Sequence, residues 1–248
     1  MAFTRIHLIM RDAGLGSRRH AEELIREGCV TLNGRVVQDP GEKADPFKDH
    51  IKVSGKLLRP PDPVKYYYVF NKPRNVVSTF DDPQGRPCLG DLLRPLKKRL
   101  FAVGRLDFDA EGLMILTNDG DLAQALSHPS HAVPRTYLVK VKGEPASDAL
   151  SRIRKGMAIG EGDRVGEVTC TVLSRQKTTT WLKVVLFEGK KNEVKRIFTR
   201  INHPVRKLRR IQFGPLSLGK LPVGQRKPLT AAEIAKVKSL ARSTDRRS

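Results

Sequence analysis

The sequence predicts an α+β protein with two domains joined by a proline-rich linker. A helix–helix–hairpin pattern occupies the first 56 residues, and after residue 66 strand-like segments dominate without the regular strand–helix alternation of a doubly wound fold. Between them, LLRPPDPVK (57–65) holds three prolines in nine residues, which disfavours helix and central strand alike. We therefore expect domains at 1–60 and 61–240, followed by a basic polar tail at 241–248 that is disordered.

The first domain is expected to be a small α/β module. A short helix is predicted from Thr4 to Asp12, ended by Gly14, and Ser17 is expected to cap a second helix that stops at Gly28. Next, the dipeptide Asn33-Gly34 stands between two β-rich runs, which predicts a hairpin with a two-residue turn. A further strand is expected in HIKVSG. We expect a phosphate-binding group on the second helix, formed by Arg18, Arg19 and Arg26.

The second domain is expected to contain a mixed, mainly antiparallel sheet with interspersed helices. Apolar and β-branched runs predict strands at 66–72, 113–118, 135–143, 165–174 and 178–187, of which the last two should pair in antiparallel fashion. Helical periodicity predicts helices at 121–128, 145–156, 192–202 and 230–241.

The chain is strongly basic. Its 248 residues include 47 Lys plus Arg and 26 Asp plus Glu, a formal net charge of +21, and residues 188–248 alone hold 17 basic against 4 acidic side chains. A small soluble domain usually carries a net charge of about 2–8, so nucleic acid is the first partner to consider. The densest run is Arg206, Lys207, Arg209 and Arg210. In a regular strand the outer two would share one face and the inner two the other, and we interpret the run as a phosphate-binding surface.

Several classes of protein are disfavoured. The longest apolar stretches have four to six residues, far below the roughly 18 that span a bilayer, so no membrane is expected as a partner. The N-terminal stretch carries charges within its only apolar run, unlike a secretory signal. Cys29, Cys88 and Cys170 are far apart and form no CxxC pair, which disfavours a disulfide framework and a cysteine zinc site and fits a reducing cytoplasm.

The densest polar segment is GRLDFDAEGLMILTNDGD (104–121), with Asp107, Asp109 and Glu111 at a spacing of two. This spacing resembles the start of a calcium loop, but the twelfth position is Asn118 rather than Glu, and the intervening run 113–116 is apolar and calls for burial. Calcium is therefore disfavoured. A metal-dependent nuclease that uses the three carboxylates stays open as an alternative.

A second interpretation is that Asp107 acts alone as a nucleophile. A carboxylate that attacks carbon has to be ionised, desolvated and held in place. A neighbouring cation keeps it ionised when water is removed. This interpretation predicts a basic partner from another part of the fold, and it leaves Asp109, Glu111 and Asp119 with structural roles.

The sequence resembles the bacterial ribosomal RNA pseudouridine synthases of the RsuA/RluB group. The segment GRLDFDAEGLMILTNDGDLAQALSHP is similar to the signature of that family, and residues 4–56 resemble its S4 RNA-binding domain. The motifs Asn71-Lys72-Pro73, Arg135-Thr136-Tyr137 and Glu188 to Arg196 follow in the order of the family. The resemblance covers nearly the whole chain, and several separated motifs in register are more specific than any one of them.

The resemblance implies a role for each of several residues. Asp107 would be the nucleophile, and Tyr137 would stack on the target uracil. Lys195 would be the cation that pairs with Asp107, with Arg196 as the fallback, and Arg105 would help to take the nucleotide out of its stack. A lysine gives a point charge rather than a bidentate fork, so the pair would be less fixed in geometry than one with arginine. The residues expected to bind RNA are Arg18, Arg19, Arg26, Lys72, Arg196, Arg206, Lys207, Arg209 and Arg210.

The implied reaction converts a ribosomal uridine to pseudouridine, and the DPQGRP segment (82–87) favours large-subunit over small-subunit RNA. An enzyme can reach the target base only after the base has left its helix, which costs free energy. Stacking of the base on an aromatic side chain offsets part of this cost. No cofactor and no metal are expected. The expected partner is ribosomal RNA or an assembling subunit, bound by a monomer. The alternative is a non-catalytic ribosomal RNA-binding assembly factor of the same fold.

Overall fold

The computed structural model describes residues 3–16, 18–60, 62–96, 98–128 and 131–245. Its contacts divide the chain into two units, Met1–Lys65 and Tyr66–Ser248. The division falls at the end of the proline-rich segment, and each unit has its own hydrophobic core. No described helix combines the length and apolarity that crossing a membrane would require.

The first unit contains two helices and short strands. Its elements are β1 Thr4–Arg5, α1 Ile6–Ala13, α2 Arg18–Arg26, β2 Val30–Leu32, β3 Arg35–Val36, β4 Lys43–Ala44, β5 Ile51–Val53 and β6 Lys56–Leu57. The first helix ends at Gly14 (φ 110°), as predicted, but it begins at Ile6 because Thr4 is paired in β1 with β4. The predicted cap Ser17 lies outside the described residues.

The predicted hairpin is confirmed. Asn33 and Gly34 both have positive φ (50° and 88°), the conformation of a type I′ turn, and Leu32 pairs with Arg35 across it. The strands form a four-stranded sheet in the order β3-β2-β5-β6, and one face of α1 and α2 packs on it through residues such as Ile9 and Ile25. The polar face of α2 is left to solvent, whereas every residue of α1 is buried or half-buried.

The second unit is built on a nine-stranded sheet that is mainly antiparallel, as predicted. Its strands are β7 Tyr67–Lys72, β8 Phe101–Val103, β9 Glu111–Thr117, β10 Arg135–Lys142, β13 Thr169–Gln176, β14 Thr179–Leu186, β15 Val205–Phe213, β16 Leu216–Ser217 and β17 Arg226–Pro228. The order is β13-β14-β10-β15-β9-β7-β17, with β8 beside β9 and β16 beside β15. Strands β9 and β15 pair in parallel.

Strand β9 is apolar on both sides because it has a hydrophobic core on each face. Met114 and Leu116 belong to one core, while Leu113 and Ile115 belong to the other. Successive side chains of a strand point to opposite faces, so the uninterrupted run 113–116 is what a strand buried on both sides requires. This burial excludes a solvated calcium loop over the same residues.

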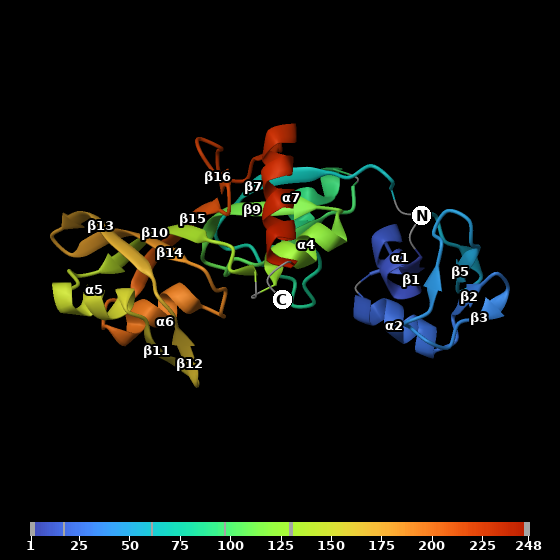
Figure 1. Ribbon diagram of the computed structural model, residues 1–248, viewed down its shortest axis with the longest axis horizontal. Coiled ribbons are helices and arrows are strands. Elements are labelled where there is room, and N and C mark those ends of the chain that lie inside the picture. The colour runs from blue at the N-terminus through green and yellow to red at the C-terminus, as the bar shows by residue number, and fades with distance from the viewer. Residues whose placement is uncertain (1–2, 17, 61, 97, 129–130, 246–248) are drawn as a thin grey trace. The chain divides into compact units, whose positions relative to one another are not determined.

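Helices cover both cores of the second unit. Helices α4 (Gly120–Ser127) and α7 (Ala231–Asp245) pack beside β7 and β9, whereas α5 (Ser147–Arg154) and α6 (Glu193–Arg200) lie by β10, β13 and β14 (Figure 1). A short hairpin of β11 (Met157–Gly160) and β12 (Asp163–Val165) contacts α6, and a small helix α3 (Leu89–Leu93) precedes β8.

The predicted disordered tail is wrong in its first part. Residues 241–245 continue α7, since no Gly or Pro stands between Ala241 and Asp245 to end the helix. Residues 246–248 lie outside the described residues.

Gly112 allows the parallel pair β9–β15 to form. Its φ is 119°, and a Cβ added there would lie 2.2 Å from the Arg210 carbonyl oxygen and 2.6 Å from the Arg210 nitrogen. A side chain at this position would push the two central strands of the sheet apart.

We expect Gly112→Ala to lower the free energy of unfolding in urea by about 3 kcal/mol or more, because the added carbon meets backbone that cannot yield. The matched control is Gly224→Ala, which has a positive φ of 78° but nothing within 4 Å of the added carbon. The control should lose about 1 kcal/mol from backbone strain alone. Equal losses for the two variants would refute the proposed close approach.

Candidate active site

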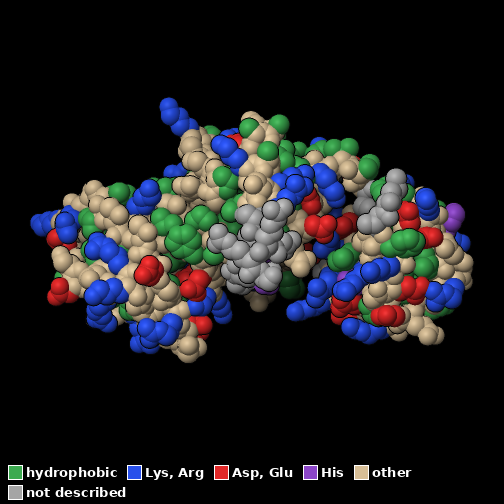
Figure 2. Space-filling model, in the orientation of Figure 1, with side chains coloured by type: hydrophobic (Ala, Val, Ile, Leu, Met, Phe, Trp, Pro, Cys, Tyr) green, Lys and Arg blue, Asp and Glu red, His purple; other side chains and the backbone are tan. Residues whose placement is uncertain are grey.

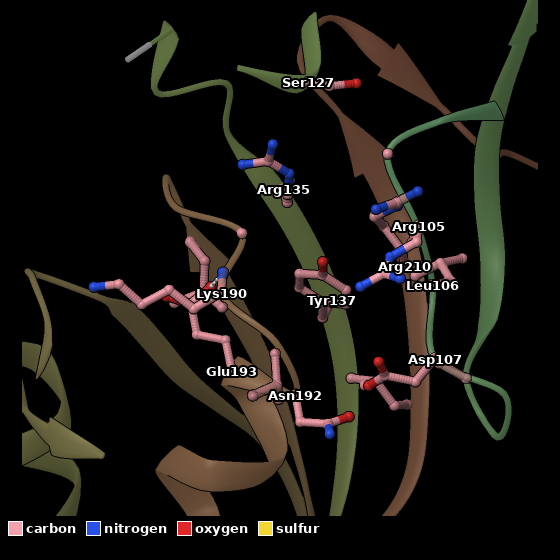
Figure 3. Close-up of a pocket in the computed structure, with 16 residues that line it drawn as sticks. Arg105, Leu106, Asp107, Ser127, Arg135, Tyr137, Lys190, Asn192, Glu193 and Arg210 are labelled. Atoms are coloured by element: carbon pink, nitrogen blue, oxygen red, sulfur yellow. Dashed lines mark hydrogen bonds between the residues drawn. The ribbon is translucent and has the colours of Figure 1, made fainter. Parts of the chain in front are cut away.

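A cavity of about 140 Å³ opens between β10, β15, the loop before β9 and the start of α6. A six-membered ring fits a space of this size, since a cavity of about 150 Å³ holds benzene. It is lined by Gly104, Arg105, Leu106, Asp107, Ala110, Ser127, Arg135, Tyr137, Leu186, Gly189, Lys190, Asn192, Glu193, Val194, Leu208 and Arg210 (Figure 3). The lining combines apolar side chains with carboxylates and cations.

Asp107 lies in a loop that is anchored on both sides. The side chains of Leu106 and Ala110 are buried, and the Ala110 amide donates to the Asp107 carbonyl at 3.1 Å. The Ser78 hydroxyl donates to the Leu106 carbonyl at 2.6 Å and accepts from the Leu106 amide at 3.1 Å. The carboxylate itself stays 33% exposed. The loop is therefore rigid in its backbone and open at its functional group.

The buried side chain of Lys72 is the main support of this loop. Its ammonium donates to the carbonyls of Pro73, Asp107 and Ala110 at 2.9, 3.2 and 3.0 Å, and the residue is fully buried. Burial lowers the pKa of Lys72 to about 8, against the opposing effect of nearby carboxylates that include Asp107 and Asp109. The prediction that Lys72 binds RNA is wrong, because β7 directs its side chain into the interior.

Lys195 is the cation that faces the Asp107 carboxylate. It lies in the first turn of α6, and its Nζ is 3.3 Å from Asp107 Oδ2 and also pairs with Asp109. Burial works to lower the pKa of Lys195, but the two carboxylates outweigh it and raise that pKa. Burial likewise works to raise the pKa of Asp109, and the bond to Lys195 lowers it overall. Both charges are thus held in their ionised forms.

The neighbouring Arg196 points away from Asp107. Its guanidinium donates to Asp163 Oδ2 at 2.7 Å and to the Ile159 carbonyl at 3.3 Å, which ties α6 to the β11–β12 hairpin. Adjacent helical residues point about 100° apart, so only one of Lys195 and Arg196 can reach the loop. The structure brings Lys195 there.

Tyr137 and Arg135 come from β10 and point to the same side of the sheet. The Tyr137 ring, 9% exposed, forms a wall of the cavity (Figure 3). Arg135 is buried, and its Nη1 donates to the Val133 and Glu188 carbonyls at 3.1 and 2.7 Å. This side chain fixes the loop that leads into α6. Arg105 is exposed and lines the cavity beside the loop of Asp107.

Two cavity residues were missed in the sequence. Asn192 has a φ of 52° just before α6, and with its amide nitrogen toward Asp107 it donates to both carboxylate oxygens at 3.0 and 3.1 Å. Glu193 is 5% exposed, and burial raises its pKa to about 6. Asparagine adopts a positive φ more readily than most residues, which is a weak sequence signal for Asn192, although its side chain does not cap α6. The sequence gives no sign that Glu193 is buried, because a charged residue in a helical pattern is usually exposed.

The three carboxylates of the 104–121 segment do not converge on one point. Asp107 and Asp109 share Lys195, whereas Glu111 faces Arg209, whose Nε is 3.8 Å from Glu111 Oε1. The described residues contain no group of three or more His, Cys, Asp or Glu side chains arranged to hold a metal ion. This geometry gives no support to a three-carboxylate metal site.

The basic run on β15 divides between surface and interior. Arg206 and Lys207 are exposed, Arg209 is half-buried, and Arg210 is 1% exposed. The expectation that Arg206 and Arg210 share an open face is wrong. Register shifts at both ends of the β10–β15 pairing leave Arg206 and Ile211 unpaired, and such bulges break the regular alternation of faces.

Other predicted RNA-binding residues lie on the exposed side of α2. Arg18 and Arg26 are on either side of Glu22, at 3.4 and 3.8 Å, and Arg19 is exposed. In the second unit, Lys and Arg side chains gather over α5, α6 and the β11–β12 hairpin, with acidic side chains between them (Figure 2). Both units therefore offer cations to a polyanion.

Comparison with known proteins gives two matching families. The model described as RNA pseudouridylate synthase matches residues 66–200, and the S4 domain model matches residues 4–51. The chain is 37% identical over 238 residues to the ribosomal large subunit pseudouridine synthase B of Bacillus subtilis, covering 96% of each protein. It is 39% identical over 236 residues to an uncharacterized RNA pseudouridine synthase of Mycobacterium bovis, covering 94% of this chain and 92% of that protein.

A solved structure is also similar. The crystal structure of a pseudouridylate synthase matches with a TM-score of 0.69 and 27% identity, over 94% of this chain and 99% of that one. The similarity extends over both units of the chain.

Replacing Lys72 with Met removes the donors of three backbone carbonyls while keeping an unbranched side chain. Each unpaired buried acceptor costs about 1–3 kcal/mol, and removal of a buried charge offsets part of this. We expect the free energy of unfolding in urea to fall by about 2–4 kcal/mol and amide hydrogen exchange across 104–110 to accelerate.

The matched control is Lys142→Met, at the exposed end of β10. It should leave the free energy of unfolding and the exchange of the 104–110 amides unchanged. Wild-type exchange across 104–110 in Lys72→Met would show that the ammonium does not hold the loop.

Proposed function

This chain belongs to the RNA pseudouridylate synthase family, and we propose that it converts a specific uridine of large-subunit ribosomal RNA to pseudouridine. The observation that carries the proposal is the pairing of Asp107 with Lys195 beside a ring-sized cavity walled by Tyr137. This arrangement offers a carboxylate, a cation paired with it and an aromatic surface in one space.

Asp107 is the proposed nucleophile. Its carboxylate is open to substrate, and Lys195 and the Asn192 amide lie against it, so its oxygens keep a cation and a hydrogen-bond donor beside them when RNA displaces water. The Lys72 ammonium holds the backbone of the same residue. An attacking oxygen whose position is set in advance loses little entropy on reaching the sugar or the ring.

The target base enters the cavity as a flipped nucleotide. A cavity of about 140 Å³ admits the uracil ring and excludes a stacked neighbour. Stacking on an aromatic side chain returns about 1–3 kcal/mol, against a flipping cost of a few kcal/mol. Tyr137 supplies this surface, and Arg105, exposed beside the cavity, stands where it can occupy the space that the base leaves.

The proposed reaction is an isomerisation of the uridine. The bond between C1′ and N1 breaks, the bond between C1′ and C5 forms, C5 loses a proton and N1 gains one. The atoms of substrate and product are the same and no electrons are exchanged. Acid–base and nucleophilic groups are therefore sufficient, and we propose catalysis without a cofactor or metal by a cytoplasmic monomer.

We assign RNA binding to both domains. Residues 1–60 form the proposed S4 RNA-binding domain, which uses Arg18, Arg19 and Arg26, and residues 61–240 form the proposed catalytic domain. The choice of large-subunit RNA rests on the name of the Bacillus subtilis relative and on the DPQGRP segment at 82–87. An assembling subunit presents the same RNA before its proteins cover it.

Replacing Asp107 with Asn removes the nucleophile but keeps the size of the side chain. In cells that carry this change in the chromosomal gene, we expect one pseudouridine of large-subunit RNA to fall to background and the small-subunit map to stay unchanged. In vitro, the rate of conversion should drop by about 10⁴-fold or more, with RNA affinity retained.

Asp121→Asn, an exposed change in the first turn of α4, is the control and should leave the map intact. An unchanged map in Asp107→Asn cells would favour a non-catalytic assembly factor. Loss of activity on chelation would favour a metal-dependent enzyme instead.

The exposed part of the basic run should contribute to the salt dependence of binding. For Arg206→Gln/Lys207→Gln we expect weaker RNA binding and a slope of log K against log salt that is less steep by about 1.4, since each contact to single-stranded phosphate contributes about 0.7. Filter binding between 50 and 200 mM salt measures the slope.

The control Lys236→Gln/Arg242→Gln removes the same charge from the exposed side of α7. It should change the slope little. An equal effect of the two double variants would mean that total charge, and not the position of Arg206 and Lys207, governs binding.

A further inference from the structure

We propose that Arg210 is a further catalytic residue, whose guanidinium donates a hydrogen bond to a carbonyl oxygen of the target uracil and stabilises the negative charge that the ring gains as its glycosidic bond breaks. This inference rests on the proposed function and deepens it. It assigns to the uracil oxygen a partner that neither the nucleophile nor the aromatic wall provides.

Arg210 occupies the centre of the site. On β15 it pairs with Tyr137 of β10 on one side and with Gly112 of β9 on the other. It therefore stands between the strand that bears the aromatic wall and the strand that follows the Asp107 loop. Figure 3 shows its guanidinium on the cavity wall between Tyr137 and Asp107.

The guanidinium has donor capacity that the protein leaves unused. Its Nε donates to the Leu113 carbonyl at 2.7 Å, and its Cζ lies 5.2 Å from the centre of the Phe213 ring. These contacts fix the direction of the side chain. Its Nη2, however, is buried and has no acceptor among the described residues.

An unpaired buried donor of this kind points to an absent acceptor. Arginine keeps its proton inside proteins, and burying a charge without a partner is costly. No carboxylate forms an ion pair with Arg210 in the described part of the chain, although Asp107, Asp109 and Glu111 all pair with other cations nearby. The guanidinium can therefore donate to an acceptor that enters the cavity.

The chemistry of the acceptor follows from the cavity. The space fits one ring, and the acceptors on the edge of uracil are its two carbonyl oxygens. When C1′–N1 breaks, the electron pair passes to the ring and spreads onto these oxygens. A hydrogen bond from a cation strengthens as its acceptor becomes negative. Arg210 would then stabilise the departing ring more than the bound substrate, which is the requirement for catalysis.

The experiment measures single-turnover conversion of large-subunit RNA taken from Asp107→Asn cells, which lacks the modification. We expect Arg210→Met to slow conversion by about 10²–10³-fold and to leave the Kd for RNA within about threefold. Arg154→Met is the matched control, because the Nε of Arg154 also donates to a backbone carbonyl, that of Cys170, at 3.0 Å, away from the cavity. Its rate should equal that of the wild type.

Sulfur substitution separates contact from structural support. Transcripts that carry 2-thiouridine or 4-thiouridine in place of uridine present a poorer acceptor at one position of the ring. One of them should slow the wild-type enzyme but not further slow Arg210→Met. Should Arg210→Met fail to fold, Arg210→Lys, which keeps the charge but moves the donor, takes its place in the same comparison.

Two results would overturn the proposal. One is a wild-type rate in a folded Arg210 variant, and the other is an equal sulfur effect in wild type and variant. Absence of pseudouridine with the wild-type protein would overturn the proposed function itself, and this inference with it. Conversion by the wild type together with an insensitive Arg210 variant would leave the function standing and remove only the role of Arg210.

Discussion

The buried ammonium of Lys72 is the interaction on which the rest of the site depends. It gathers the carbonyls of Pro73, Asp107 and Ala110, which belong to two segments far apart in the sequence. Carbonyl oxygens cannot satisfy one another, so two such segments can meet in the interior only around a donor. Lysine supplies three donors at the end of a flexible stem. The position of the Asp107 carboxylate is therefore set by a charge that never meets solvent.

The three cations around Asp107 have separate roles. Lys72 holds the backbone, Lys195 meets the carboxylate from the partly exposed side, and Arg210 faces the cavity. Lys72 and Arg210 are buried and Lys195 is only partly so, and burial determines how strongly a charge acts on its surroundings.

Much of the fold could be predicted because it follows from local rules. The Asn33-Gly34 turn, the strand at 66–72 and the antiparallel pair at 165–187 each depend on neighbours in sequence. Burial of Lys72 and Arg210 could not be predicted, since a charged residue in a strand is usually exposed and only tertiary packing decides otherwise. The bulge at Arg206 is similar: it arises from the pairing of β10 with β15, which the chain brings together over more than sixty residues.

The distribution of the +21 charge now has a physical interpretation along a single strand. On β15, Lys207 is exposed and Arg210 is buried at the cavity, and three residues of strand span roughly 10 Å. A flipped nucleotide has to extend its ring inward while its phosphates stay in water. Lys207 and Arg210 stand three residues apart in a regularly paired stretch and point to opposite faces of the sheet, so only Arg210 can meet the flipped ring, while Lys207 is open to phosphates elsewhere along the RNA. Surface cations contribute affinity that salt weakens, whereas a buried guanidinium is little screened, as the role proposed for Arg210 requires. We therefore relate the exposed part of the +21 charge to RNA affinity, and the buried Arg210 to the proposed reaction.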